Sequence, residues 1–152
     1  MRRATMLAGV LLVAGCSSEN DLSLPAPPNG LPTAYATSDC APADGPATRL
    51  YLTSEPADIL PPPAPFVDVA VWQAAGAIAG KRLEWTGPSS DGNARRCTAA
   101  DACDEATSVT LQFRPREADS SLSGTIALTF ADGSSIAGGF NAAWRPRRQL
   151  CG

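Results

Sequence analysis

The feature that most restricts the fold is a two-residue alternation of apolar and polar residues in the last third of the chain. The segments 108–114, 122–131 and 136–144 each place apolar side chains at every second position. Such alternation is typical of strands with one buried and one solvated face. Asp132-Gly133 separates the last two segments and is a strong hairpin signal. The pattern therefore predicts consecutive antiparallel strands.

The rest of the chain continues this theme with shorter segments. We expect strands at 49–53, 67–72 and 82–86, and a long polar loop from Gly87 to about Glu105. The segment 73–80 fits either a short helical turn or a connection broken by glycine. With no long amphipathic helix, these elements predict an all-β domain, a small antiparallel sandwich or barrel of about six to eight strands. Gly138-Gly139 predicts a bulge or a sharp coil in the last strand.

The N-terminus has the layout of an export signal. Arg2 and Arg3 are followed by an apolar run from Met6 to Gly15 and then by polar residues. A membrane-spanning helix needs about 20 apolar residues, twice the length of this run. The segment 1–15 is therefore predicted to be a removable signal peptide.

The residues before Cys16 resemble a bacterial lipobox. Val13-Ala14-Gly15-Cys16 places an aliphatic residue and small residues before a cysteine whose thiol would carry the diacylglycerol. The resemblance implies a lipoprotein of the cell envelope that carries palmitate and is anchored stably by two or three acyl chains. Ser17 follows the cysteine, where aspartate favours retention in the inner membrane. This resembles the pattern of outer-membrane lipoproteins if the source has two membranes.

The next segment is rich in Ser, Asn, Pro and Gly and has no apolar periodicity. Its prolines lack the backbone N–H that helices and sheet interiors use. We therefore expect a lipidated flexible tether over 16–38, extended by up to about 3 Å per residue. It is a passive spacer or, alternatively, a proline-rich docking motif. A single β domain is expected over 39–152.

Four cysteines remain once Cys16 is assigned to lipid. An even count in an exported chain indicates two disulfides, and three connectivities are possible. Cys97 and Cys103 share one predicted loop, whereas Cys40 opens the domain and Cys151 nearly ends it. We expect Cys97–Cys103 and Cys40–Cys151. The spacings fit neither a zinc motif nor a redox pair.

The composition argues against several chemistries. The chain contains no histidine, which removes His-based acid–base catalysis and His-ligated metals. Its only lysine, Lys81, is expected to be exposed in a turn, which does not suit a Ser-Lys dyad. We therefore expect no enzyme, no cofactor and no metal. Loss of Arg2 and Arg3 leaves ten basic and fifteen acidic residues, a balance that does not favour nucleic acid.

Three groups of residues are candidates for binding. Two arginine clusters could bind an anionic glycan or lipid head group if the fold brings them together, or could simply be solvated: Arg95, Arg96, Arg145, Arg147 and Arg148. The tryptophans Trp72, Trp85 and Trp144 could form a platform for sugars, but in strand phase such residues commonly belong to the core. Acidic turn residues near 91–105 could bind calcium weakly, although their spacing matches no EF-hand.

The C-terminal half resembles uncharacterised small β-domain lipoproteins of high-GC bacteria such as myxobacteria. The shared elements are Cys97 with Cys103, the segments Gly124–Gly133 and Gly139–Trp144, and the ending Cys151-Gly152. The resemblance implies no known activity.

The sequence thus predicts a membrane-anchored, non-catalytic binding domain with an unknown protein or glycan partner. The alternatives are a structural or assembly accessory of an outer-membrane complex and an inhibitor of an envelope-attacking enzyme. A binding domain should present an exposed aromatic or basic concavity. An accessory should present a sizeable apolar patch or an exposed edge strand.

Overall fold

The computed structural model describes residues 23–115, 121–148 and 150–151. The predicted signal peptide and Cys16 lie outside these residues. Within the described segments, no helix has both the length and the apolar character needed to cross a membrane.

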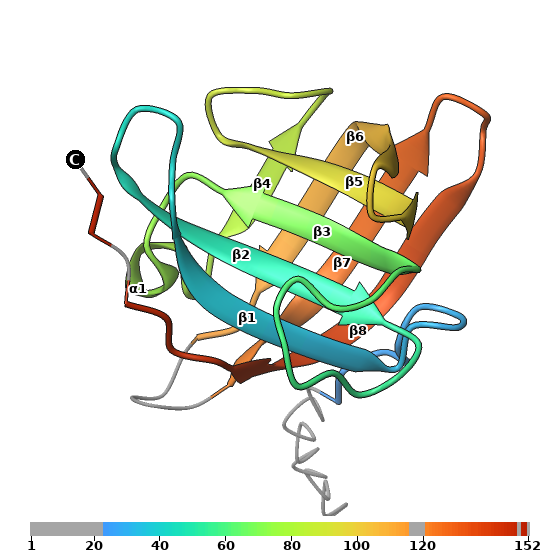
Figure 1. Cartoon of the computed structure of the whole chain (residues 1–152), viewed down its shortest axis with the longest axis horizontal. Coiled ribbons are helices and arrows are strands. Elements are labelled where there is room, and N and C mark those ends of the chain that lie inside the picture. Colours follow the sequence, from blue (N-terminus) through green and yellow to red (C-terminus); the bar gives the residue numbers. More distant parts are fainter. Residues whose placement is uncertain (1–22, 116–120, 149, 152) are drawn as a thin grey trace, which may run out of the picture.

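The described chain is almost entirely β-structure, as predicted (Figure 1). One helical turn, α1 (Ala75–Ile78), lies between β3 and β4 in the segment that the sequence left open. The strands are β1 (Thr33–Cys40), β2 (Pro46–Thr53), β3 (Phe66–Val71), β4 (Arg82–Trp85), β5 (Gly92–Ala99), β6 (Ala102–Phe113), β7 (Leu122–Phe130) and β8 (Ser135–Trp144).

Seven of the strands close into a barrel, and β4 is an additional strand paired with β6. We call β1, β2, β3 and β5 the front wall and β6, β7 and β8 the back wall. The first third of β6 pairs with β5, and its longer remaining part pairs with β7, so β6 joins the walls. All neighbours are antiparallel except β1 and β8, which are parallel over Tyr35–Ala143 and Ala36–Trp144. The antiparallel prediction is therefore wrong for that one pair.

Side chains fill the barrel interior. The predicted inward residues of the back wall are buried, except Ile136 and Trp144 of β8, which are partly buried against the core, and they pack with the alternate residues of the front wall. Alanines beside large side chains let the layers fit a small barrel, and Ile78 of α1 closes one end. The largest fully buried side chains include Phe113, Leu50, Leu52, Ile78, Leu111, Leu122 and Leu128.

The front wall is also covered on its outside. Every residue of β3 is buried, and Tyr51, Phe66 and Cys97 form a second apolar cluster on the outer face. The proline-rich segment 54–65 covers this cluster with Leu60 and Ala64, and the Ala57 amide donates to the Tyr35 hydroxyl at 2.9 Å. The front wall is therefore buried on two faces.

The ordered domain begins earlier than residue 39. Residues 33–38 belong to β1, and residues 23–31 form a leg that lies against the barrel. The Gly139 amide donates to the Ala26 carbonyl at 2.8 Å, Pro28 is buried, and Leu31 packs on the core. The tether expected over 16–38 is therefore too long. Its prolines are tolerated because the segment runs beside the edge of a strand, where the missing backbone N–H of proline interrupts no sheet interior.

Gly138-Gly139 is explained by this leg and not by a bulge. The pairing of β8 with β7 runs through both glycines without a shift. A Cβ atom at Gly139 would lie 2.2 Å from the Pro25 carbonyl oxygen, and one at Gly138 would lie 2.5 Å from the Pro28 nitrogen. Glycine is needed here because another backbone approaches closely.

The polar loop expected over 87–105 is the second wrong assignment. Much of it forms β5 and the start of β6, joined by a tight turn after Ala99. The inward positions of β5 hold glycine, alanine and arginine rather than large apolar residues, so its sequence lacks the hydrophobic alternation that marks the back wall.

The strand directions give the barrel two distinct ends. The hairpin end carries the β5–β6 turn, the β7–β8 turn and the segment 54–65. The helix end carries α1, the β1–β2 turn at 41–45, the start of β4 and the C-terminal tail. These names are used below.

Candidate functional site

Both predicted disulfides are present. Cys97 and Cys103 face each other across β5 and β6, with Cα atoms 4.0 Å apart. Cys40 at the end of β1 is joined to Cys151, with Cα atoms 5.5 Å apart and a sequence separation of 111. The second bridge holds the C-terminal tail on the helix end of the barrel.

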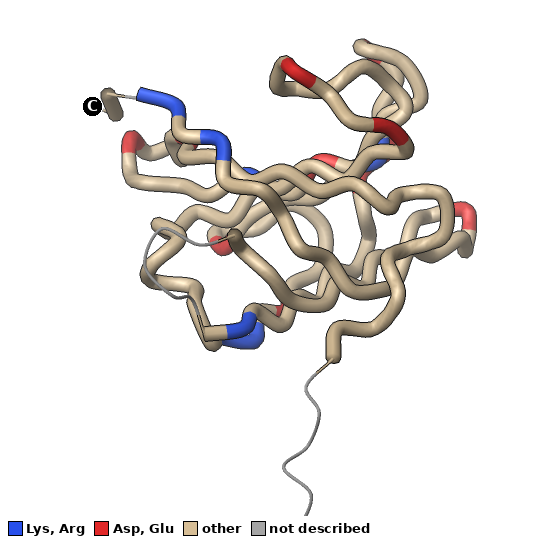
Figure 2. Tube along the Cα trace, turned by 90° about the horizontal axis from the view of Figure 1, so that it is seen from below, with Lys and Arg blue, Asp and Glu red and all other residues tan. Residues whose placement is uncertain are grey.

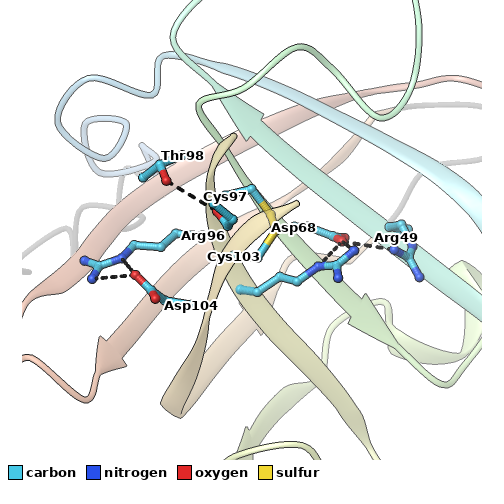
Figure 3. Close-up of a disulfide and its surroundings, with 9 residues drawn as sticks. Arg49, Asp68, Arg96, Cys97, Thr98, Cys103 and Asp104 are labelled. Atoms are coloured by element: carbon cyan, nitrogen blue, oxygen red, sulfur yellow. Dashed lines mark hydrogen bonds and ion pairs between the residues drawn. A yellow bond between two sulfur atoms is a disulfide. The ribbon is translucent and has the colours of Figure 1, made fainter. Parts of the chain in front are cut away.

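Arg95 belongs to an ion-pair network on the outer face of the front wall. Asp68 of β3 is 3 % exposed, and one of its oxygens, Oδ2, accepts from Arg49 at 3.0 Å and contacts Arg95 at 2.9 Å. Arg49 also pairs with Asp39. Figure 3 shows Arg49 pointing toward Asp68 beside the Cys97–Cys103 bridge. Arg95 is thus engaged within the wall.

Burial and charge act together in this network. Burial works against the charge of Arg49, but Asp68, Tyr51 and Asp39 outweigh it and raise the pKa of its guanidinium. Burial, followed by the nearby Asp68 charge, raises the pKa of the Tyr51 hydroxyl. The Oδ1 atom of Asp68 is buried without a hydrogen-bond partner. The raised pKa values keep Arg49 protonated and Tyr51 neutral beside the buried Asp68.

Arg96 lies at the hairpin end, on the opposite side of β5 from Arg95. Its guanidinium pairs with Asp104 at 3.1 Å and with Asp132 at 2.7 Å, and it lies 4.3 Å from the centre of the Phe130 ring. Hydrogen bonds from Ser134, followed by the one from Arg96, lower the pKa of Asp132 well below its usual value. Arg96 therefore closes this end of the core with a charged side chain.

The C-terminal arginines lie elsewhere. Arg145 stacks over the Tyr35 ring at 5.0 Å, and its amide donates to the Ala36 carbonyl at 2.7 Å. Arg147 and Arg148 are exposed in the tail. From Tyr35 to Arg95 the wall crosses three strand spacings, about 14 Å. The fold therefore does not bring the two predicted arginine clusters together.

The three tryptophans have different environments. Trp85 is buried in the core, as the more common alternative predicts. Trp72 is half-buried and lines an open hollow of about 420 Å³, together with residues of the β1–β2 turn and the β4–β5 loop. Trp144 lines a second hollow of about 330 Å³ that also includes Asp39 and Cys151. No single platform of three rings forms.

Hydrogen bonds hold Trp72 in place at the hollow that it lines. The indole N–H of Trp72 donates to the Ser89 carbonyl at 3.1 Å, and the Trp72 amide donates to the Asp91 carbonyl at 2.9 Å. One wall is the turn residues Ala41, Pro42, Ala43 and Gly45, and the other is Ser89 and Ser90. The indole ring of Trp72 is therefore held by the hydrogen bond of its N–H group. It lies between apolar turn residues on one side and two serines on the other.

The acidic residues considered for calcium do not gather at one point. Asp91 lies beside Trp72 at the helix end, whereas Asp101 and Asp104 lie at the hairpin end. Across the described segments, no group of three or more potential metal-ligating side chains is found.

Charge separates between the two ends of the barrel, as Figure 2 shows along the trace. At the helix end the described basic residues are Lys81, Arg82, Arg114, Arg145, Arg147 and Arg148, and the acidic ones are Asp39, Asp44, Glu84 and Asp91. At the hairpin end the described acidic residues are Glu55, Asp58, Asp101, Asp104, Glu105 and Asp132, and the basic one is Arg96.

This separation was not predicted from the sequence. Lys81 and Arg82 are distant from Arg114 in sequence, and only the pairing of β4 with β6 places them at one end. The separation can be recognised only once the order and pairing of the strands are known.

Comparisons of the chain with protein-family models, curated proteins and solved structures give no significant match.

Proposed function

We propose that the protein is a lipid-anchored lipoprotein of the cell envelope whose barrel is a non-catalytic binding domain. The anchor is supported by the charged N-terminus, the short apolar run and the Val13–Cys16 motif. Two disulfides suit an exported protein, because such bridges persist in oxidising compartments. Ser17 favours the outer membrane where the source has two membranes.

One observation carries the binding role, namely the hollow lined by Trp72. The barrel interior is filled by side chains, so a ligand has to bind outside it. A volume of about 420 Å³ falls within the range of small-molecule sites. An indole ring held in this way is suited to stacking on the apolar face of a sugar, and the exposed hydroxyl of Ser90 suits its polar edge. We propose an uncharged glycan segment as the ligand.

The charges near the hollow support this choice. Asp44 and Asp91 are exposed and adjoin residues of its two walls. Carboxylates accept hydrogen bonds from sugar hydroxyls and repel anions. The hollow is therefore better suited to a neutral sugar than to a phosphorylated ligand.

The surface favours a binding domain over an assembly accessory. Among the described residues, the large apolar side chains that are exposed are Ile59 and Leu150, and these lie on different segments. The edge strand β4 has four residues and carries an exposed Arg82–Glu84 pair, a feature that discourages strand addition.

Lipidation is tested by metabolic labelling with an alkyne analogue of palmitate. We expect label on the wild-type protein and none on the Cys16→Ser variant. An unlabelled wild-type protein that is processed and exported would overturn the anchor.

The binding role is tested by titrating soluble glycan fragments of the envelope and following the indole signals by NMR. We expect saturable shifts of the Trp72 indole signal and loss of binding in Trp72→Ala, whereas Trp72→Phe keeps part of it. The matched control is Ile59→Ala, which removes an apolar side chain far from the hollow. Equal binding by Trp72→Ala and the control would overturn this site.

A further inference from the structure

We propose that the corner of the helix end formed by Lys81, Arg82 and Arg114 rests on the membrane and contacts anionic phospholipid head groups. This inference depends on the proposed lipid anchor at Cys16. It adds an orientation and a lipid-contacting surface to that proposal.

The first step is the length of chain between anchor and barrel. Residues 23–31 lie on the barrel, so seven steps along the chain separate Cys16 from Ser23. A fully extended chain spans at most about 3.6 Å per residue, so this segment cannot exceed about 25 Å. A tether reaching to residue 38 would have permitted about three times that distance. The barrel is thus confined to the neighbourhood of the bilayer.

The second step is where the leg leaves the barrel. Ser23, Leu24 and Pro25 line a hollow together with Gly80, Arg114 and Pro115, and with Gly124 and Thr125 at the start of β7. This is the helix end of the back wall. From there the leg passes Gly139 in the middle of β8 and reaches Leu31 before β1 begins. The anchored chain therefore emerges at the helix end, and the hairpin end points away.

The third step is charge. Lys81 and Arg82 are exposed, and Arg114 is half-buried next to the exit of the leg. Glu84 is the one described acidic residue of β4 and pairs with Arg82. Glu19 and Asp21 of the connecting segment are repelled by the same lipids, so the attraction has to come from the barrel. Basic groups held near an anionic leaflet are attracted to it within a Debye length.

The C-terminal arginines serve as an internal comparison. Arg145 stacks on Tyr35 of the front wall, whereas Ser23 lies against the back wall. In Figure 2 the C-terminal tail lies well away from the point where the N-terminal chain leaves. Arg147 and Arg148 thus carry the same charge as Lys81 and Arg82 at the helix end, but they do not adjoin the point where the leg leaves the barrel.

The experiment places the lipidated protein in nanodiscs that contain lipids bearing a chelated gadolinium ion and follows backbone amide signals by NMR. In discs with three parts of anionic phosphatidylglycerol to seven of phosphatidylcholine, about the content of an anionic leaflet, we expect attenuation at 80–82, Arg114 and Thr125. Amides at Asp101 and Asp132 should keep their intensity. The pattern should be lost in discs of phosphatidylcholine alone.

The variant Lys81→Glu/Arg82→Glu should lose the pattern while remaining lipidated. The matched control, Arg147→Glu/Arg148→Glu, makes the same change in net charge and should keep it. Uniform attenuation, attenuation strongest at the hairpin end, or equal effects of both variants would overturn the orientation. Palmitate labelling of the same samples separates the proposals: an unlabelled protein overturns both, whereas a labelled protein without directional attenuation overturns only this one.

Discussion

The front and back walls of the barrel share one interior, but their outer faces differ in what covers them. On the back wall, Ala127, Thr129 and Asn141 face solvent in alternation with buried residues. On the front wall, the outer residues of β3 are Phe66, Asp68 and Ala70, and all are buried. The segment 54–65 and the arginine network supply the cover. The outer face of a barrel wall can therefore be buried beneath a covering loop and a set of ion pairs.

This difference matters for function. The back wall carries the leg that leads to the predicted anchor, whereas the front wall holds the network of Asp68 and the bridge to the C-terminal tail. The ends are distinguished by charge, and the walls by their coverings. Four measurements test whether the two walls differ in this way, and they are described in order of decreasing expected effect.

The largest effect is expected for Phe66→Ala on the front wall. Phe66 is 6 % exposed and meets the Tyr51 ring edge-on at 6.0 Å. Loss of a buried ring costs about 3–5 kcal/mol of unfolding free energy. Thr129→Ala on the outer face of the back wall should cost less than about 0.5 kcal/mol. Urea denaturation measures both, and similar values for the two variants would show that the outer faces are energetically equivalent.

Asp68→Ala should be next, because it leaves Arg49 and Arg95 without their shared carboxylate. Breaking a fully buried pair costs about 3–5 kcal/mol, and the partial exposure of both arginines reduces this to about 2–3 kcal/mol. Asp104→Ala removes a carboxylate from the exposed pair with Arg96 and should cost about 0.5 kcal/mol. Equal costs in urea denaturation would contradict a buried network on the front wall.

Gly139→Ala tests the leg on the back wall. Its Cβ atom would meet the Pro25 carbonyl, so the leg has to move and the bond from Gly139 to Ala26 weakens. We expect a loss of about 1–2 kcal/mol, the cost of crowding together with one hydrogen bond. Amide exchange should accelerate at Gly139 first. The control is Gly45→Ala, where a Cβ atom meets nothing within 4 Å; a larger loss there would refute the leg's position.

The smallest effect concerns pH and the hairpin end, where the two walls meet. The pKa of Asp132 is lowered in the folded protein, so its carboxylate contributes stability above the unfolded value of about 3.9. That contribution disappears as the pH falls through the lowered pKa. The difference in stability between wild type and Asp132→Asn should therefore be larger at pH 7 than at pH 3. A difference independent of pH would contradict the contacts with Ser134 and Arg96.

The back wall could be predicted strand by strand, since Val109, Leu111, Phe113 and their counterparts in β7 point inward as expected. Its one solvated face leaves a visible period of two. The front wall was harder because its outer face is buried as well. There, β5 was predicted to be a loop because the adjacent residues Arg95 and Arg96 interrupt any alternation of apolar and polar side chains. Both residues are satisfied by carboxylates that come from other strands.

The candidate sites divide in the same manner. The disulfide partners followed from the count and placement of the cysteines, and the structure confirms both pairs. The Trp72 hollow could not be predicted, since its walls come from segments about 45 residues apart. The basic corner near Ser23 likewise joins β4, β6 and the leg.

By itself the sequence determined the all-β class, the disulfide pairing and the inward residues of the back wall, and it predicts the lipid anchor. These depend on local period, on counts and on short motifs, which a linear chain displays directly. Only the tertiary structure decided that the strands close into a barrel, that the expected tether is largely part of the domain, and that Asp68 is buried between arginines. Each of these depends on contacts between segments distant in sequence, whose free energy exists only once the chain has brought them together.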